Sequence, residues 1–179
     1  DLEPSFRILE WYGIPEVHIL RKMYEGAYFK AEANGLSSAP IPLTRGTKQG
    51  DPLSPTLFNL VINVLLRMVA VSGHSLAFSS KQAHACGGFA DDIALVQDST
   101  ASTNALLNGP IADFCWWTGM EVNTQKSVVS AIDYSTGRDL PTNAVHFGGQ
   151  RLASCTMCTA NKYLGVHISL DLKWGAEKA

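Results

Sequence analysis

Two adjacent aspartates, Asp91 and Asp92, interrupt an apolar stretch of the chain. In a regular strand the two side chains would point to opposite faces of the sheet, whereas at a turn the bend lets both carboxylates approach one side. Two carboxylates that close repel each other unless a cation neutralises them. Mg²⁺ is the natural partner, because it accepts one or two carboxylates and otherwise keeps water and phosphate oxygens. The alternative is an exposed turn in which Asp is simply a good turn former.

The distribution of charge points to the same stretch. The 179 residues carry a net charge of −2, which excludes a strongly basic nucleic-acid module and a polyanionic disordered tail. Residues 51–100 alone account for this charge, and their excess of carboxylates indicates either solvent exposure or a bound cation. The acidic residues of this stretch are Asp51, Asp91, Asp92 and Asp98, and the basic ones are Arg67 and Lys81.

A glycine-rich basic loop, residues 45–55, precedes a long apolar segment. Its backbone amides and the N-terminus of the following helix, together with Lys48 and Gln49, could bind an anionic or hydroxyl-rich ligand. The alternative is a capped helix start, with Asp51 or Ser54 as the cap and proline at the first helical position. Both interpretations can hold together. The residue order of a Walker P-loop is absent.

Two further features carry weaker signals. Residues 119–127 form a glycine stop and a turn that ends near Lys126, and a lone lysine on a turn is usually a solvated charge. Cys155 and Cys158 have the spacing of half a zinc site, but no second pair follows. We therefore interpret the four cysteines as ordinary buried thiols and not as a disulfide framework.

The elements that must position these residues follow from periodicity and turn signals. Helices are predicted over residues 16–26, 52–71 and 102–118, the last kinked at Gly109-Pro110. Asn34-Gly35 predicts a hairpin between residues 28–33 and 36–43. This alternation favours an α+β fold in which helices pack on one face of an antiparallel sheet. Further strands are predicted at residues 83–88, 93–96, 128–132, 145–147, 151–155 and 163–168, with a polar break at residues 134–144.

Taken in order, the chemistry-bearing segments resemble the reverse transcriptase domain of non-LTR (LINE-type) retrotransposons. Each motif is short, but four in one order at plausible separation are specific, and the resemblance covers nearly the whole chain. The glycine-rich loop with Gln49-Gly50 and Ser54-Pro55 is similar to the family's motif B, and residues 89–92 are similar to motif C. Residues 119–127, which include Lys126, are similar to motif D. Residues 162–166 are similar to the tyrosine–leucine–glycine strand that follows the palm.

The resemblance implies a fold and a division of the chain. The fold would be the ferredoxin-like palm of polymerases, an antiparallel sheet with helices on one face, present here in truncated form. Residues 1–50 would be a helix and hairpin on the fingers side, and residues 51–133 the palm core. Residues 134–179 would end the palm and lead toward a thumb outside the chain.

The resemblance also implies RNA-directed DNA synthesis by two metal ions, Mg²⁺ or Mn²⁺. Asp91 would ligate the metal ions, with Asp92 as the more peripheral carboxylate. Lys126 would donate a proton to the pyrophosphate leaving group or stabilise its charge.

Contacts to nucleotide and template are implied for seven residues. Gln49 and Gly50 would contact the sugar and base pair of the incoming nucleotide, whereas Ser54 and Pro55 would press on the template side. The other members of this group are the loop residues Arg45 and Lys48, and Phe89, which stands where many relatives have tyrosine.

The implied partners are template RNA or DNA, a DNA primer and dNTPs. The remaining fingers, the thumb and any endonuclease part of the parent polyprotein would complete the protein. We expect no membrane contact, because no window approaches about 18 uninterrupted apolar residues. No targeting signal is visible, and the resemblance implies an intracellular protein of nucleus and cytoplasm.

One expected motif is missing from the chain. The family's motif A aspartate, which completes the metal site, should precede the turn at residues 13–15, and Asp1 is too close to that turn to be this residue. We expect the true aspartate just upstream. Two carboxylates without the third should bind Mg²⁺ weakly, so the fragment alone is predicted to be a weak or inactive polymerase.

Two alternatives remain open at this stage. A group II intron-like maturase has related motifs B and C, although residues 51–55 favour the retrotransposon type. A non-catalytic remnant of a decayed retroelement would keep a palm that only folds or binds nucleic acid, and the intact aspartate pair argues against long decay.

Overall fold

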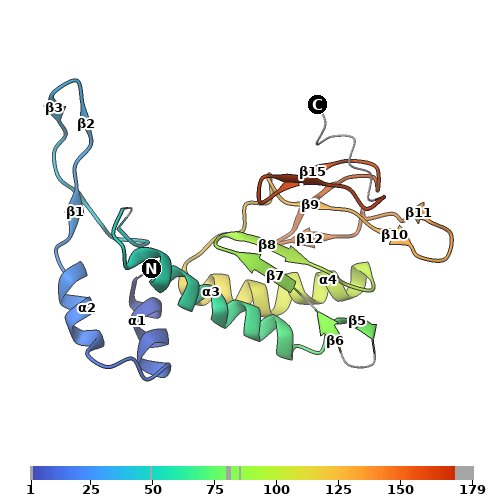
Figure 1. Cartoon of the computed structure of the whole chain (residues 1–179), viewed down its shortest axis with the longest axis horizontal. Coiled ribbons are helices and arrows are strands. Elements are labelled where there is room, and N and C mark those ends of the chain that lie inside the picture. Colours follow the sequence, from blue (N-terminus) through green and yellow to red (C-terminus); the bar gives the residue numbers. More distant parts are fainter. Residues whose placement is uncertain (1, 49, 80–81, 85, 172–179) are drawn as a thin grey trace. The chain divides into compact units, whose positions relative to one another are not determined.

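A computed structural model of the chain describes residues 2–48, 50–79, 82–84 and 86–171 (Figure 1). The chain divides into two compact units, residues 1–64 with 117–120 and residues 65–116 with 121–179. Helices and short strands alternate in it, which confirms the α+β class. The predicted domain boundaries at residues 50 and 133 stay a prediction.

The first unit is built on two helices, α1 (Leu2–Trp11) and α2 (Val17–Tyr24), joined by a turn at Gly13 with φ of 73°. Sequence analysis missed α1, although Leu2, Phe6 and Leu9 recur at helical spacing. The helices bury a shared apolar core, and Arg21 of α2 forms ion pairs with Glu3 and Glu10 of α1. The buried members of this core are Phe6, Leu9, Val17, Tyr24 and Leu57.

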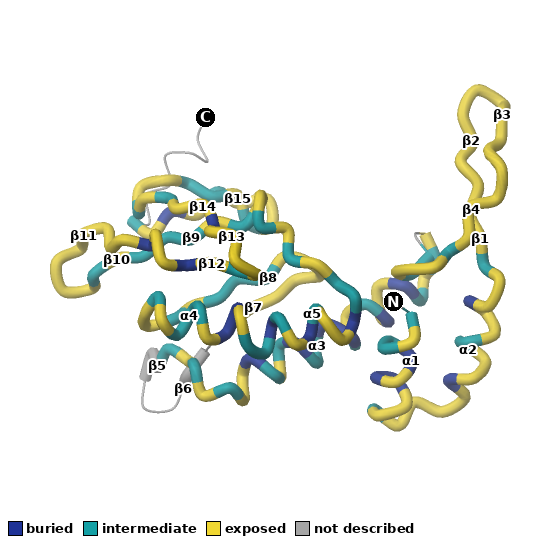
Figure 2. The backbone as a smooth tube through the Cα atoms, turned by 180° about the vertical axis from the view of Figure 1, so that it is seen from behind, coloured by how far each residue is buried: buried dark blue, intermediate teal, exposed yellow. Residues whose placement is uncertain are grey.

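The hairpin predicted at Asn34-Gly35 is confirmed. Strand β2 (Glu32–Ala33) pairs with β3 (Leu36–Ser37) across this turn, and β1 (Tyr28–Phe29) pairs with β4 (Ile41–Pro42) at its base. Asn34 and Gly35 have φ of 52° and 74°, the left-handed values that a tight two-residue hairpin turn requires. All eight strand residues of this ribbon are exposed (Figure 2).

Helix α3 (Ser54–Val71) follows the glycine-rich loop and begins two residues later than predicted. Leu57, Val61 and Leu65 are buried at successive turns, so one stripe of the helix faces the protein core. The 18 residues have a mean hydropathy of 1.6, long and apolar enough to cross a membrane by these two criteria, which the core helix of a globular domain also meets. About a third of the helix, 33%, is buried within the protein.

A second helical segment belongs mainly to the second unit. It consists of α4 (Thr100–Leu106), a π-helical turn η1 (Leu107–Ile111) and α5 (Ala112–Thr118). The predicted kink is confirmed, because Gly109 leaves helical geometry immediately before Pro110. Ser99 caps α4 by accepting a hydrogen bond from the Ser102 amide at 3.1 Å.

The strands of the described chain form eight two-stranded ladders, and the single palm sheet stays a prediction. Seven ladders are antiparallel, whereas β9 and β14 pair in parallel. Besides β1 to β4, the strands are β5 (Leu76–Ser79), β6 (Gln82–His84), β7 (Cys86–Phe89), β8 (Asp92–Leu95), β9 (Val128–Val129), β10 (Ile132–Asp133), β11 (Arg138–Asp139), β12 (His146–Phe147), β13 (Gln150–Arg151), β14 (Ala153–Ser154), β15 (Asn161–Tyr163) and β16 (Val166–Ile168).

Several predicted strands are wrong in their extent. Residues 128–132 form two strands, and residues 163–168 form a hairpin across Leu164-Gly165, whose φ values of 51° and 86° end the first strand. The polar break at residues 134–144 contains β11, which pairs with β10. Residues 151–155 divide into parts of β13 and β14, and residues 83–88 divide into parts of β6 and β7, with residue 85 outside the described residues.

Candidate functional site in the aspartate hairpin

The two aspartates lie at the tip of the β7–β8 hairpin, as predicted. Phe89 pairs with Asp92, so Ala90 and Asp91 are the two residues of the turn. Ala90 has φ of 52°, a left-handed conformation that residues other than glycine rarely adopt. The turn therefore places Asp91 outside the ladder and Asp92 at the first position of β8.

The β7–β8 hairpin packs closely against helix α3. A Cβ atom on Gly88 would lie 3.2 Å from Leu66 Cδ2, so the backbone of β7 approaches this side chain more closely than most residues allow. The Cys86 thiol lies 3.9 Å from the Leu66 carbonyl oxygen, and burial raises the pKa of this thiol. The glycine thus fixes the hairpin against the helix within the second unit.

Both carboxylates face solvent. Asp91 and Asp92 are exposed, and Phe89 beside them is 67% exposed. Over the described ranges, neither carboxylate takes part in a hydrogen bond or ion pair with another side chain. Their oxygens are therefore available as ligands for a hard cation.

The donor set fits part of a magnesium site. Mg²⁺ is bound through one or two carboxylates together with water and substrate phosphates, and the adjacent pair Asp91–Asp92 offers that number. Among residues 2–48, 50–79, 82–84 and 86–171, no group of three His, Cys, Asp or Glu side chains could hold a metal ion. The pair would hold a metal by itself only weakly.

Lys126 lies in a compact turn of the same unit and is exposed. Its backbone amide donates to the Asn123 carbonyl at 3.1 Å, and the Asn123 side-chain oxygen also accepts from this amide at 3.2 Å. Ser127 donates its hydroxyl to the Asn123 carbonyl at 2.9 Å. The turn therefore fixes the backbone at Lys126 and leaves its side chain in solvent.

Three polar side chains of the glycine-rich loop form contacts with α2 or with the backbone of the loop. The Lys48 ammonium donates to the Met23 carbonyl at 3.0 Å and lies 5.3 Å from the centre of the Tyr24 ring. The Ser54 hydroxyl, almost fully buried, donates to the Lys48 carbonyl at 2.6 Å. The Asp51 carboxylate accepts from the Leu53 amide at 3.0 Å. The predicted capping of the helix start is supported for Asp51, which accepts from an amide just before α3, whereas Ser54 donates its hydroxyl to a carbonyl and therefore does not cap the helix.

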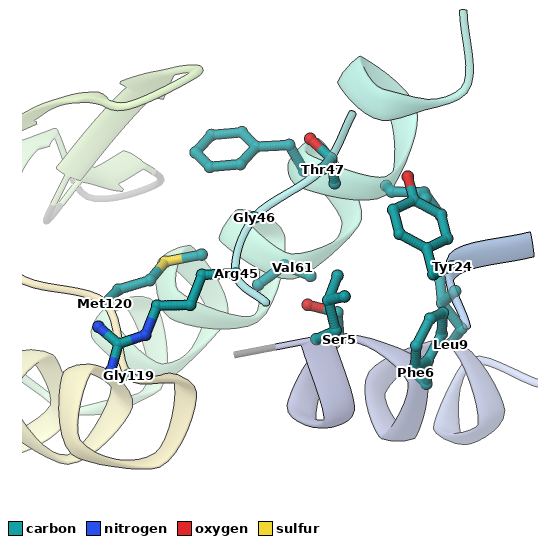
Figure 3. Close-up of a pocket in the computed structure, with 13 residues that line it drawn as sticks. Ser5, Phe6, Leu9, Tyr24, Arg45, Gly46, Thr47, Val61, Gly119 and Met120 are labelled. Atoms are coloured by element: carbon teal, nitrogen blue, oxygen red, sulfur yellow. The ribbon is translucent and has the colours of Figure 1, made fainter. Parts of the chain in front are cut away.

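Arg45 lies beside a pocket within the first unit (Figure 3). The pocket has a volume of about 150 Å³, and most of its lining is apolar. The buried hydroxyl of Tyr24, which lines this pocket, has no hydrogen-bond partner in the part of the chain that the structure describes, whereas Gly46 and Thr47 contribute the loop side of the wall. Gly50 and Pro55 are exposed, and Gln49 lies outside the described residues.

The predicted site residues therefore belong to two units. Phe89, Asp91, Asp92 and Lys126 lie in the second, whereas the described residues of motif B lie in the first. The hydrogen bond from Thr124 to Gln150, which also holds the Lys126 turn, was not predicted, because the two residues lie 26 positions apart and form no motif. All four cysteines were predicted to be buried, but Cys86, Cys115 and Cys155 are half-buried, and Cys158 is exposed because it lies in the turn at residues 157–158.

Comparison with known proteins identifies the class. The family model described as reverse transcriptase (RNA-dependent DNA polymerase) matches residues 1–168, so the chain belongs to this family. The chain is 31% identical over 167 residues, 90% of its length, to the retrovirus-related Pol polyprotein from type-2 retrotransposable element R2DM of Drosophila melanogaster. It is 34% identical over 107 residues, 60% of its length, to a Pol polyprotein from type-1 retrotransposable element R2 of Popillia japonica.

These relatives confirm the resemblance to the reverse transcriptase domain of non-LTR retrotransposons and define the extent of the match. The chain spans 15% of the Drosophila polyprotein and 15% of the Popillia polyprotein. A second Popillia polyprotein is 29% identical over 145 residues, and the chain spans 24% of it. The chain therefore corresponds to part of a reverse transcriptase domain within much longer proteins.

Proposed function

We propose that this chain carries part of the active site of an RNA-directed DNA polymerase, with Asp91 and Asp92 as metal ligands. The supporting observation is the exposed carboxylate pair at the tip of the β7–β8 hairpin, without a partner among the described residues, in a chain that the reverse transcriptase family model matches over residues 1–168. Family membership supports the class of reaction, and the hairpin supports the choice of these two residues. The palm-like arrangement of the full sheet belongs to this proposal.

The reaction is nucleotidyl transfer to a primer. The primer 3′ oxygen attacks the α-phosphorus of a dNTP, a new phosphodiester bond forms, the bond to the β-phosphate oxygen breaks, and pyrophosphate leaves. Bound Mg²⁺ or Mn²⁺ ions would lower the pKa of the primer hydroxyl and stabilise charge on the phosphate oxygens. Asp91 and Asp92 would supply carboxylate oxygens for these ions, and water, substrate phosphates or a further carboxylate would complete their ligand shells.

Lys126 acts on the leaving group in this proposal. Its ammonium is exposed on a turn whose backbone is fixed, so it can approach a phosphate and donate a proton or a charged hydrogen bond. A pyrophosphate that gains a proton leaves more readily, because less negative charge develops on it. Lys126 therefore contributes to the rate of the step and not to metal binding.

The glycine-rich loop has a supporting role in this proposal. Lys48 is hydrogen-bonded to the backbone of α2 and Ser54 to the backbone of the loop, so both hold the loop that contains Gly50. Arg45, Gln49, Gly50 and Pro55 are the remaining candidates for contact with nucleotide or template. Template RNA or DNA, a DNA primer, dNTPs and the other parts of a longer polyprotein are the proposed partners. A nuclear and cytoplasmic location, implied by resemblance alone, remains part of the proposal.

Primer extension with a polypeptide that contains this chain within a complete reverse transcriptase domain tests the proposal. Asp91→Asn should lower the rate of dNTP incorporation by roughly 10²–10³-fold or more, because a group that supports transition-state charge is lost. Asp113→Asn is the matched control, since Asp113 is an exposed aspartate of the same unit on α5. The control should retain its rate.

Two results would contradict the proposal. An inactive parent polypeptide on both RNA and DNA templates would favour a non-catalytic remnant that only folds or binds nucleic acid. An active parent in which Asp91→Asn and Asp113→Asn behave alike would show that the metal ligands lie elsewhere.

A further inference from the structure

The turn that carries Lys126 is attached to the rest of the second unit on both sides. Before the lysine, the Thr124 hydroxyl donates to the side-chain oxygen of Gln150 at 2.6 Å. After it, β9 pairs in parallel with β14, with Val128 opposite Ala153. Because Thr124 and Val128 lie on either side of Lys126, the two attachments leave little freedom for the backbone between them.

Gln150 is itself held by a second layer of contacts. It lies in β13 and pairs with Phe147 of β12. Two asparagines of the α4–η1 segment, Asn104 and Asn108, each form two hydrogen bonds with the backbone in and beside β12, one as donor and one as acceptor. Asn104 donates to the Ala144 carbonyl at 2.7 Å and accepts from the His146 amide at 3.0 Å, and Asn108 donates to the His146 carbonyl at 2.9 Å and accepts from the Gly148 amide at 3.3 Å.

These contacts connect the aspartate hairpin with the lysine turn. Strand β8, which begins at Asp92, leads through residues 96–99 directly into α4. From α4 the connection runs through Asn104 and Asn108 to β12, from β12 to Gln150, and from Gln150 to Thr124. Every member belongs to the second unit, so the path is continuous within one compact body.

We infer that Gln150, acting through Thr124, is a positioning residue that fixes the Lys126 turn relative to the aspartate hairpin. This inference rests on the proposed function of Lys126. Gln150 is exposed, so its hydrogen bond adds little to the stability of the whole unit, but it restrains a residue two positions before Lys126. Loss of the bond should therefore change the order of the turn far more than it changes global unfolding.

The first experiment measures the order of the turn directly in the 179-residue chain. Trypsin cleaves after Lys126 only when the turn opens, and mass spectrometry resolves this cleavage from the others. Thr124→Val keeps the size of the side chain but removes the hydroxyl, and should accelerate cleavage after Lys126 roughly two- to tenfold, the value of one exposed hydrogen bond. Thr124→Ser keeps the hydroxyl and should cleave like the parent.

Thr159→Val is the matched control for this experiment. Thr159 makes a comparable exposed hydroxyl contact with Thr156 at 2.8 Å, elsewhere in the same unit. The control should leave cleavage after Lys126 unchanged. Equal cleavage rates in Thr124→Val and the parent, or equal acceleration in Thr159→Val, would overturn the inference, whatever the polymerase assay shows.

The second experiment asks whether Gln150 acts through the lysine. In an active polypeptide that contains this chain, Gln150→Met removes the acceptor and should lower kcat for incorporation several-fold, whereas Gln150→Glu keeps an acceptor and should restore most of it. In a Lys126→Ala background, Gln150→Met should cost nothing further. An undiminished effect in that background would overturn the inference. A parent that fails to extend primers contradicts the proposed function, and the trypsin result then decides separately whether the hydrogen bond between Thr124 and Gln150 orders the turn.

Discussion

The glycine-rich loop and the aspartate hairpin are both polar segments in an apolar chain, but their polar side chains differ in whether they form hydrogen bonds with the protein backbone. In the loop, Lys48 and Ser54 are committed to backbone carbonyls, and Asp51 accepts from a backbone amide. In the hairpin, Asp91 and Asp92 are exposed and unpartnered within the described part of the chain.

Polar residues that hold the fold therefore differ from polar residues that are available to a ligand in whether they satisfy a backbone group. A side chain that satisfies a backbone group contributes to stability, so its removal should lower the free energy of unfolding. A side chain that forms no hydrogen bond within the protein can be removed without lowering the free energy of unfolding, so its removal should affect only the binding of a ligand. Four substitutions test this division.

Ser54→Ala should have the largest effect on stability. The almost fully buried hydroxyl donates to the Lys48 carbonyl at 2.6 Å, and this bond closes the loop onto the start of α3. Its loss should lower the free energy of unfolding by about 1 kcal/mol. Chemical denaturation of the chain measures this change. A free energy of unfolding equal to that of the parent would show that the loop does not depend on this bond.

Lys48→Met should have a smaller effect in the same direction. Methionine keeps most of the apolar stem but loses the charge over the Tyr24 ring and the hydrogen bond to Met23. We expect a loss of about 0.5–1 kcal/mol. Lys30→Met, a change at an exposed lysine of the β1–β4 ribbon, serves as the control in the same denaturation experiment. Equal losses of unfolding free energy at both positions would show that the contacts of Lys48 do not stabilise the fold.

Glu3→Gln should have a small effect that depends on pH. A hydrogen bond from Arg21 holds the pKa of Glu3 below its ordinary value of 4.5. The ionised carboxylate therefore stabilises the folded state fully above pH 4.5, and this contribution is lost as the pH falls through the lower pKa of the folded protein. The parent should exceed Glu3→Gln in stability near neutral pH, and the two should converge in acid. A difference that stays constant from pH 7 to pH 3 would contradict this account.

Asp91→Asn combined with Asp92→Asn should have the smallest effect on stability. Neither carboxylate has a partner among the described residues, so the double substitution should stay within about 0.5 kcal/mol of the parent, as is usual for surface positions. Removal of the repulsion between the two charges favours a slight gain. A marked decrease of the melting temperature would show that the two carboxylates stabilise the fold, as Lys48 and Ser54 of the loop are expected to do.

The sequence by itself determined the class of the protein and most of its local elements. Motif order predicted the reverse transcriptase family, which the match over residues 1–168 confirms. Local chemistry also sufficed where a few neighbouring residues decide the backbone. Asn34-Gly35 turns the first hairpin because both residues adopt positive φ, and Gly109-Pro110 kinks the helical segment because proline lacks an amide hydrogen.

Only the tertiary structure decided which polar side chains are committed and which are free. Lys48 reaches a carbonyl 25 positions earlier in the chain, and Thr124 reaches a side chain 26 positions later, so no local pattern reports either contact. The same holds for the parallel pairing of β9 with β14, because a strand of two residues takes its partner from the packing around it. A hydrogen bond between distant residues depends on the position of both backbones, and the folded chain alone supplies that position.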